Sequence, residues 1–235
     1  MFGWEFPPFQ AGGLATATVG LVKGLLKTRT AVTLVVPFPV ESSPLPGLRM
    51  VGADGPAQEL VVHRIPSPMT PYGGAQEYQE IFSTIQRDPS RKSGAVYGAD
   101  LFQEVARYAA LAGGIAAREP HDVIDTHDWI TFAAGIEARK VSGRPLVAHI
   151  HATEFDRAGS GANPTICHRE WEGMTSADRI VANSHALKRT CIERYQIPAE
   201  KIDVVHWGID GVGSVPAARP RNFFALLHRV RVERT

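Results

Sequence analysis

The chain has 235 residues, 44% of them hydrophobic and 21% charged, which is typical of a folded globular protein and excludes a disordered or fibrous one. Its 25 basic and 24 acidic residues nearly cancel, so no overall charge draws it to nucleic acid or to an anionic membrane. No apolar run approaches the roughly 20 residues of a membrane span, and the N-terminus does not resemble a signal peptide. We therefore expect a cytoplasmic protein.

The first half of the chain mixes strand and helix signals. Residues 2–4 resemble a strand, residues 13–26 a helix, residues 31–36 a strong strand and residues 60–65 a further strand. A Pro- and Gly-rich stretch over residues 66–98 is longer than an ordinary connection, and such loops usually serve function. We predict a helix after it, over residues 99–118.

The second half alternates more regularly. Short β-branched runs predict strands over residues 123–126, 146–150, 179–182 and 202–205. Helical periods between them predict helices over residues 129–141, 163–175 and 184–194. This alternation is typical of βαβ units, so we predict an α/β fold with a Rossmann-like parallel sheet and helices on both faces.

The two ends of the chain suggest a domain boundary. The first strand begins almost at Met1, so we expect it to be clipped. After Asp210 the alternation stops, and residues 211–235 hold five arginines against one glutamate. We predict one domain over residues 1–210 and an aberrant or truncated tail over residues 211–235, to which we assign no function.

Polar residues gather where the predicted strands end. Gly12 and Gly13 stand where a loop enters the first helix, and bare backbone amides there can face an anion, although a tight turn explains them equally well. The other polar residues at strand ends are His127, Asp128, His151 and Ser184. Ligands bind at the carboxyl edge of an open α/β sheet, so we expect several of these side chains to converge there.

Taken together, the motifs resemble one family. The segments GWEFPP…GGL, HDW…AG, HIHATEFDR, ADRIVANS and HWGID are similar to the N-terminal domain of GT-B glycosyltransferases of the family 4 type, which are related to glycogen and starch synthases. The resemblance covers about residues 1–210. It implies two Rossmann-like domains facing across a cleft, with an acceptor-side domain followed by a domain that holds the nucleotide sugar.

The resemblance also implies roles for particular residues. Gly12 and Gly13 match the glycine pair whose amides approach the donor diphosphate, and His151 matches the histidine beside the transferred sugar, its catalytic residue. Asp128 matches an acidic position at the acceptor subsite. The resemblance further assigns acceptor binding to Glu5, Asp156 and Arg157. Transfer is expected to retain the anomeric configuration and to need no metal or other cofactor.

Two departures from the family pattern bear on function. Gln10 stands where the glycogen-synthase branch has lysine, which moves the prediction away from a storage-glucan synthase. The family's second domain supplies basic residues for the diphosphate and an acidic pair for the donor, and we find neither here. We therefore expect this chain alone to transfer sugar slowly or not at all, whereas the intact enzyme uses a nucleotide sugar and a hydroxyl acceptor.

Several of these residues can also be explained by a purely structural role. His149 lies inside its strand and is expected to be a packed core residue. Asp128 can cap the helix that follows it. For Ser184 we favour the corresponding role, as the cap of the helix predicted over residues 184–194. Residues 154–157 can equally be a solvated loop with weak local ion pairs.

Two rival functions come from other classes. One is a metal-dependent hydrolase that uses His127, His149 and His151 as ligands, although no second carboxylate follows at the end of a later strand. The other is a non-catalytic module that binds a sugar or nucleotide. We predict a glycosyltransferase domain in preference to either, with no nucleic acid or membrane partner.

Overall fold

The computed structural model describes residues 1–7, 13–37, 45–52 and 99–208. The strand predicted over residues 60–65, the loop over residues 66–98 and the tail over residues 211–235 lie outside these described residues. Within them, no helix combines the length and the apolar character that crossing a membrane requires.

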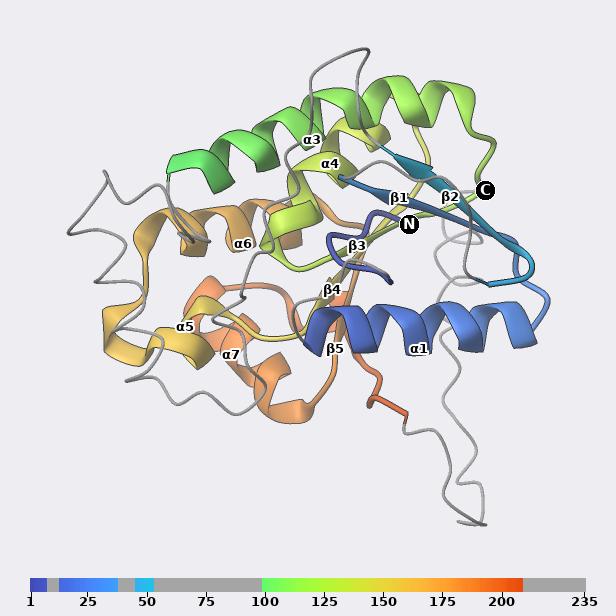
Figure 1. Cartoon of the computed structure of the whole chain (residues 1–235). Helices are drawn as coiled ribbons and strands as arrows, with labels where there is room; N and C mark the ends of the chain where they lie inside the picture. Colours follow the sequence, from blue (N-terminus) through green and yellow to red (C-terminus); the bar gives the residue numbers. More distant parts are fainter. Residues whose placement is uncertain (8–12, 38–44, 53–98, 209–235) are drawn as a thin grey trace, which may run out of the picture.

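Parallel strands form the centre of the molecule (Figure 1). Strands β1 (Val32–Val36) and β2 (Leu48–Gly52) pair in parallel, with Val32 opposite Leu48. A second group runs β3-β4-β5-β6, with every pair parallel. Its members are β3 (Ile124–His127), β4 (Leu146–Ile150), β5 (Arg179–Ala182) and β6 (Ile202–Val204).

The N-terminal segment joins the two groups of strands. Phe2 forms parallel bridges to Val35 in β1 and to Thr126 in β3. Its amide donates to the Asp125 carbonyl at 2.7 Å, and the buried Tyr108 hydroxyl lies 2.9 Å from the Val35 carbonyl. The order is therefore β2, β1, N-terminal segment, β3, β4, β5, β6, so the direction of strand addition reverses between the N-terminal segment and β3.

Helices cover both faces of the strands. In Figure 1, α3 and α4 lie above the strands and α1 lies below them. The helices are α1 (Gly13–Lys27), α3 (Ala99–Arg118), α4 (Trp129–Ser142), α5 (Glu154–Ala158), α6 (Pro164–Ser176) and α7 (His185–Tyr195), with short 3-10 turns at Gly159–Gly161 and Ala199–Lys201. The predicted α/β class and Rossmann-like arrangement are thus confirmed.

Most element boundaries follow the sequence signals. The strands predicted over residues 146–150 and 179–182 and the helix over residues 99–118 have the predicted bounds. Helix α6 begins at Pro164 after Asn163, whose side chain accepts the amides of residues 165 and 166. Among the described strands and α-helices, β2 and the five-residue helix α5 were not predicted, and neither were the two 3-10 turns.

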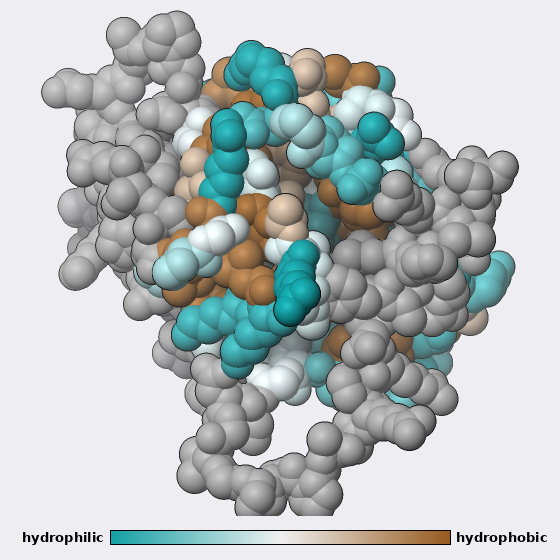
Figure 2. Space-filling model, turned by 90° about the vertical axis from the view of Figure 1, so that its right-hand side faces the viewer, coloured by the Kyte–Doolittle hydropathy of each residue, from teal (hydrophilic) through white to brown (hydrophobic). Residues whose placement is uncertain are grey.

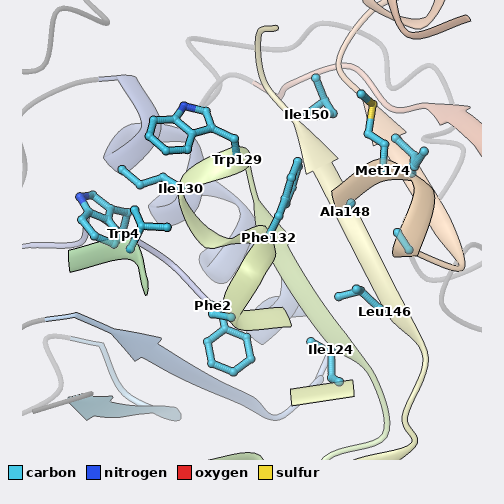
Figure 3. Close-up of a cluster of buried hydrophobic side chains, with 14 of the residues drawn as sticks. Phe2, Trp4, Ile124, Trp129, Ile130, Phe132, Leu146, Ala148, Ile150 and Met174 are labelled. Carbon is cyan, nitrogen blue, oxygen red and sulfur yellow. The ribbon is translucent and has the colours of Figure 1, made fainter. Parts of the chain in front are cut away.

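One continuous apolar cluster ties α3, α4 and α6 to β3 and β4. Figure 3 shows Phe132 of α4 beside Ala148 and Ile150 of β4, with Met174 of α6 across that strand. Gly173 permits the close approach of α6, because a Cβ atom there would lie 2.0 Å from Phe132 Cδ2. The carboxyl ends of β3 and β4 are therefore held by dense packing beneath them.

Replacing Gly173 with alanine is expected to lower the free energy of unfolding by about 1–3 kcal/mol, because the added methyl group must displace a buried phenyl ring. Urea unfolding followed by circular dichroism measures the change.

Gly20→Ala is the matched control. Gly20 lies on the exposed side of α1, and its added Cβ meets nothing within 4 Å. Alanine should leave stability unchanged or raise it by up to about 1 kcal/mol, since it favours helix more than glycine does. Equal effects of the two substitutions would contradict the packing argument.

Candidate functional site

The strand order places the candidate site at one edge of the sheet. In an open α/β sheet, ligands bind outside the carboxyl ends of the strands, where the direction of strand addition reverses. Here that point lies between the N-terminal segment and β3. Helix α1 begins at this edge, and β4 runs into α5 there (Figure 1).

The opposite edge carries a shallow hollow of another character. Figure 2 faces this end of the molecule, where apolar side chains lie among polar ones. The hollow is lined by Met1, Thr33, Ile115, His121 and neighbouring residues at the amino ends of the strands. Because ligands of this sheet type bind at the carboxyl edge, we place the candidate site there and not in this hollow.

A buried carboxylate lies at the centre of the candidate site. Asp125, in β3, is 6% exposed. One of its oxygens lies 3.3 Å from His127 Nε2, and the other lies 3.2 Å from His149 Nε2. Both imidazoles are themselves buried, so Asp125 faces a histidine with each oxygen.

The pKa values of this group follow from burial and from these contacts. Burial raises the pKa of Asp125, but the facing imidazoles of His149 and His127 outweigh it and hold the pKa at about 2. Burial lowers the pKa of His149 to about 3, against the opposing effect of Asp125. Near neutral pH the site thus contains an ionised carboxylate and a neutral His149.

His151 extends the group toward the surface. Its Nε2 lies 2.9 Å from His127 Nδ1, and its half-buried ring is inclined by 27° to that of His127. Burial lowers the pKa of His151 to about 4, so its imidazole is neutral near pH 7. Trp207, 58% exposed, stands over the ring with the two centroids 5.5 Å apart.

The peptide of His151 is held from both sides. Its N–H donates to Asp128 Oδ1 at 2.8 Å, and its carbonyl accepts from Asn183 Nδ2 at 2.8 Å. Asp128 directly follows β3 and Asn183 directly follows β5, so residues beside the strands that flank β4 fix His151, the first residue after β4.

Asp128 does not cap α4 with its side chain, which corrects the simpler role considered for it. It precedes Trp129, the first residue of α4, but its carboxylate makes no capping hydrogen bond and binds the His151 amide instead. Its backbone has φ 57° and ψ 171°, a conformation that glycine tolerates far better than other residues. Such strain clusters at functional sites and costs about 1–3 kcal/mol.

Residues 154–157 form helix α5 and not a solvated loop. Thr153 begins it with a capping box: its hydroxyl accepts the Asp156 amide, and the Asp156 carboxylate accepts the Thr153 amide at 2.8 Å. This local exchange satisfies two backbone donors at the helix start. Asp156 therefore fixes the turn that follows His151.

Arg157 lies in a buried ionic network beneath α5. Its guanidinium contacts Glu154 at 3.2 Å and Glu170 at 2.6 Å, and the Tyr195 hydroxyl also donates to Glu170. Two carboxylates share one guanidinium, and burial raises the pKa of Glu170 to about 7. The acceptor contacts predicted for Asp156 and Arg157 stay predictions, and both residues have a structural role besides.

The other residues predicted from sequence are placed as follows. Gly13 is the first residue of α1 at the candidate edge, whereas Gly12 lies outside the described residues. Glu5 is half-buried just beyond the Phe2 bridge. Ser184 caps α7, accepting the Leu187 amide at 3.1 Å, as predicted.

Sequence reasoning missed Asp125 and Asn183. Asp125 gave a signal, because an acidic residue in an apolar strand between Ile124 and Thr126 must be buried or lie at an edge. Asn183 gave none, since an asparagine before a helix cap is ordinary. His149 was predicted to be a packed core residue, and it is buried; its partner Asp125 was not foreseen.

The histidine cluster also has some features of a metal site. Ligand nitrogens of His127, His149 and His151 lie within 4.8 Å of one another. Their rings, however, are inclined by only 25° to 33°, and two of the nitrogens stand at hydrogen-bond distance. The facing nitrogens of His127 and His151 are thus occupied by each other, and the Nε2 atoms of His127 and His149 face Asp125. The arrangement therefore suits a hydrogen-bonded chain better than a metal.

Comparison with known proteins agrees with this architecture. The family model of Glycosyltransferase Family 4 matches residues 11–211, which is most of the chain. The chain belongs to this family. The resemblance found in its motifs is thus confirmed, and the glycosyltransferase assignment rests on more than the histidine cluster.

Two curated relatives show how much of a family member is present. An uncharacterised glycosyltransferase of Methanocaldococcus jannaschii is 25% identical over 213 residues, which cover 89% of this chain and 46% of the relative. A D-inositol 3-phosphate glycosyltransferase of an Arthrobacter species is 32% identical over 118 residues, which cover 46% of this chain and 28% of the relative. This family 4 chain thus matches less than half the length of either.

A solved structure has a similar fold. A sucrose-phosphate synthase chain from Thermosynechococcus elongatus superposes with a TM-score of 0.54 at 12% sequence identity, covering 89% of this chain and 91% of that one. At this identity the likeness concerns the fold alone.

The lowered pKa of His149 leads to a prediction about how the free energy of unfolding changes at acid pH. As the pH falls below 6.5, His149 in the unfolded chain takes up a proton, whereas folded His149 does not until about pH 3. Its contribution is therefore present above pH 6.5 and is lost as the pH falls toward 3, by at most about 1.4 kcal/mol per pH unit. His149→Gln should flatten the fall in unfolding free energy between pH 6.5 and pH 4.

Urea unfolding at each pH measures this difference. His168→Gln is the control, because His168 is an exposed histidine on α6. Parallel curves for wild type and His149→Gln would contradict the assignment of a depressed pKa to His149.

Proposed function

We propose that residues 1–210 are the acceptor-side domain of a GT-B enzyme that moves a sugar from a nucleotide-sugar donor to a hydroxyl acceptor. The observation that carries this proposal is the neutral, half-buried His151, held by its peptide at the strand-order reversal of a family 4 fold. The family match ends at residue 211, which supports a domain boundary near residue 210.

His151 is the proposed catalytic residue. A neutral imidazole beside the transferred sugar can accept a hydrogen bond and face the positive charge that develops at the anomeric carbon. A protonated imidazole would repel that charge. The lowered pKa of His151 supports this role, because burial keeps the ring neutral at physiological pH.

The remaining assignments concern the two substrates. We propose that Gly12 and Gly13 approach the donor diphosphate where α1 begins, because amides at a helix N-terminus attract anions. Glu5, Asp128, Asp156 and Arg157 are the proposed acceptor-side residues. Asp128 has one oxygen on the His151 amide, and a carboxylate has further lone pairs that can accept from a hydroxyl.

A second domain is proposed to complete the cleft. The chain matches less than half the length of its curated relatives, and we infer that the residues that bind the donor nucleotide lie beyond residue 210 in the whole enzyme. Donor binding supplies energy that catalysis draws on, so this chain by itself is expected to transfer sugar slowly or not at all.

Substituting His151 with alanine should lower sugar transfer on the order of 100-fold, because an aligned acceptor facing the developing charge is lost. Transfer is assayed with radiolabelled UDP-, GDP- and ADP-hexoses and D-inositol 3-phosphate, the acceptor that the names of several relatives specify. The assay uses the chain alone and the chain fused to the C-terminal half of the Methanocaldococcus jannaschii relative.

His185→Ala is the control, because His185 opens α7 nearby without contacting His151 in the described structure. Transfer that is equally fast in the wild type and in His151→Ala would remove His151 from the mechanism. Transfer by the unfused chain near ~10 s⁻¹ would contradict the need for a second domain.

The product should keep the anomeric configuration of the donor, and transfer should survive EDTA, since no metal is proposed. Proton NMR of the first product formed gives the configuration directly. An inverted product, or stoichiometric zinc or manganese in the purified protein with activity lost to EDTA, would favour the metal-dependent alternative.

A further inference from the structure

Three side chains run in a line from the sheet interior to the candidate site. The Asp125 carboxylate faces His127 Nε2 at 3.3 Å, and His127 Nδ1 faces His151 Nε2 at 2.9 Å. Asp125 and His127 are buried, whereas His151 is half-buried at the carboxyl edge. The line therefore begins at a charge and ends at the residue proposed to meet the sugar.

The contact between Asp125 and His127 is at ion-pair distance, and that between His127 and His151 is at hydrogen-bond distance. The positions of the protons along the line follow from the charge. A carboxylate has lone pairs and no proton, so the imidazole atom facing it must be an N–H. His127 then carries its proton on Nε2 and has a bare lone pair on Nδ1. His151 must accordingly donate its Nε2–H across the 2.9 Å contact, which leaves its own Nδ1 without a proton.

We propose that Asp125 and His127 are positioning residues that fix His151 as the Nε2–H tautomer, so that its Nδ1 meets a ligand as a hydrogen-bond acceptor. Among the described residues, His151 Nδ1 is buried from solvent and has no hydrogen-bond partner, so a ligand that binds it must displace what covers it. The group that binds it must then be a donor, such as a sugar hydroxyl. The opposite tautomer would present an N–H and would favour a carbonyl or a phosphate oxygen.

The buried Asp125 is matched by the two imidazoles that face it. Burying a carboxylate is costly unless donors face it, and Asp125 is faced by two imidazoles. His149 occupies the oxygen that His127 does not, so both oxygens impose an Nε2–H on their neighbour. An aliphatic residue at position 125 would impose neither.

The statement about the ligand rests on the proposed function, whereas the statement about the tautomer does not. Side-chain nitrogens of ¹⁵N-histidine-labelled, ligand-free chain are observed at pH 7.5 by long-range proton–nitrogen NMR, with His151→Gln assigning the His151 signals. The expected result is protonated Nε2 and imine-type Nδ1 in both His127 and His151. A protonated Nδ1 in His151 would overturn the proposal, whatever the outcome of the transfer assays.

Two variants test the cause of this tautomer. Asp125→Leu keeps the shape of the side chain and offers no acceptor to either imidazole, and His127→Gln interrupts the line. Each is expected to move the His151 Nδ1 resonance from the imine type toward the protonated type. Asp122→Leu is the control, because Asp122 is exposed just before β3, and it should leave the resonance in place.

The variants also separate positioning from folding. If Asp125→Leu fails to fold, as judged by its amide spectrum, the wild-type tautomers and His127→Gln still decide the question. A folded Asp125→Leu whose His151 resonances match the wild type would show that Asp125 does not set the tautomer. Wild-type tautomers as proposed, together with unimpaired transfer by His151→Ala, would refute the catalytic role and leave the hydrogen-bond direction standing.

Discussion

The negative charge of Asp125, buried in the sheet, governs the residues around it. A carboxylate in an apolar interior requires donors, and the two nearest side chains able to supply them are His127 on its own strand and His149 on the next. Each imidazole faces one oxygen of Asp125, and His127 in turn contacts His151 at 2.9 Å. In the proposed tautomer, the proton of His151 is thus placed by a charge that His151 itself does not contact.

Dense packing and local capping hold this arrangement in place. Below the strand ends, Gly173 lets α6 approach Phe132 closely, and beyond them Thr153 and Asp156 close the turn into α5. Arg157 then fastens α5 to Glu170 on α6. Within the described part of the chain, the candidate site is thus built on short connections between buried elements.

The fold could be predicted from sequence where the periodic signal was strong. The apolar runs of β4 and β5 and the Asn163-Pro164 start of α6 gave bounds within a residue of those observed. Helix α5 was missed because five residues are too few for a helical period, and its acidic residues resembled a solvated loop. Local pattern is informative over long elements and says little over one turn.

The sequence indicated where these polar side chains lie in the fold, but not which groups they contact. Strand-end placement brought His127, Asp128 and His151 to one edge, because parallel strands share their carboxyl ends. Sequence spacing could not show that Asp128 binds an amide on the next strand instead of capping α4, since the two roles use the same residue type. Contacts between strands depend on how the strands are aligned with one another, and the local pattern of residues did not show that alignment.

The two hydrogen bonds that hold the His151 peptide limit how the backbone can move. Because its N–H is tied to Asp128 and its carbonyl to Asn183, the backbone at the end of β4 cannot shift without breaking contacts to both neighbouring strands. The end of β4 is therefore a fixed wall of the candidate site. If the proposed function is correct, movements that admit substrates are expected on the side of the cleft that faces this wall.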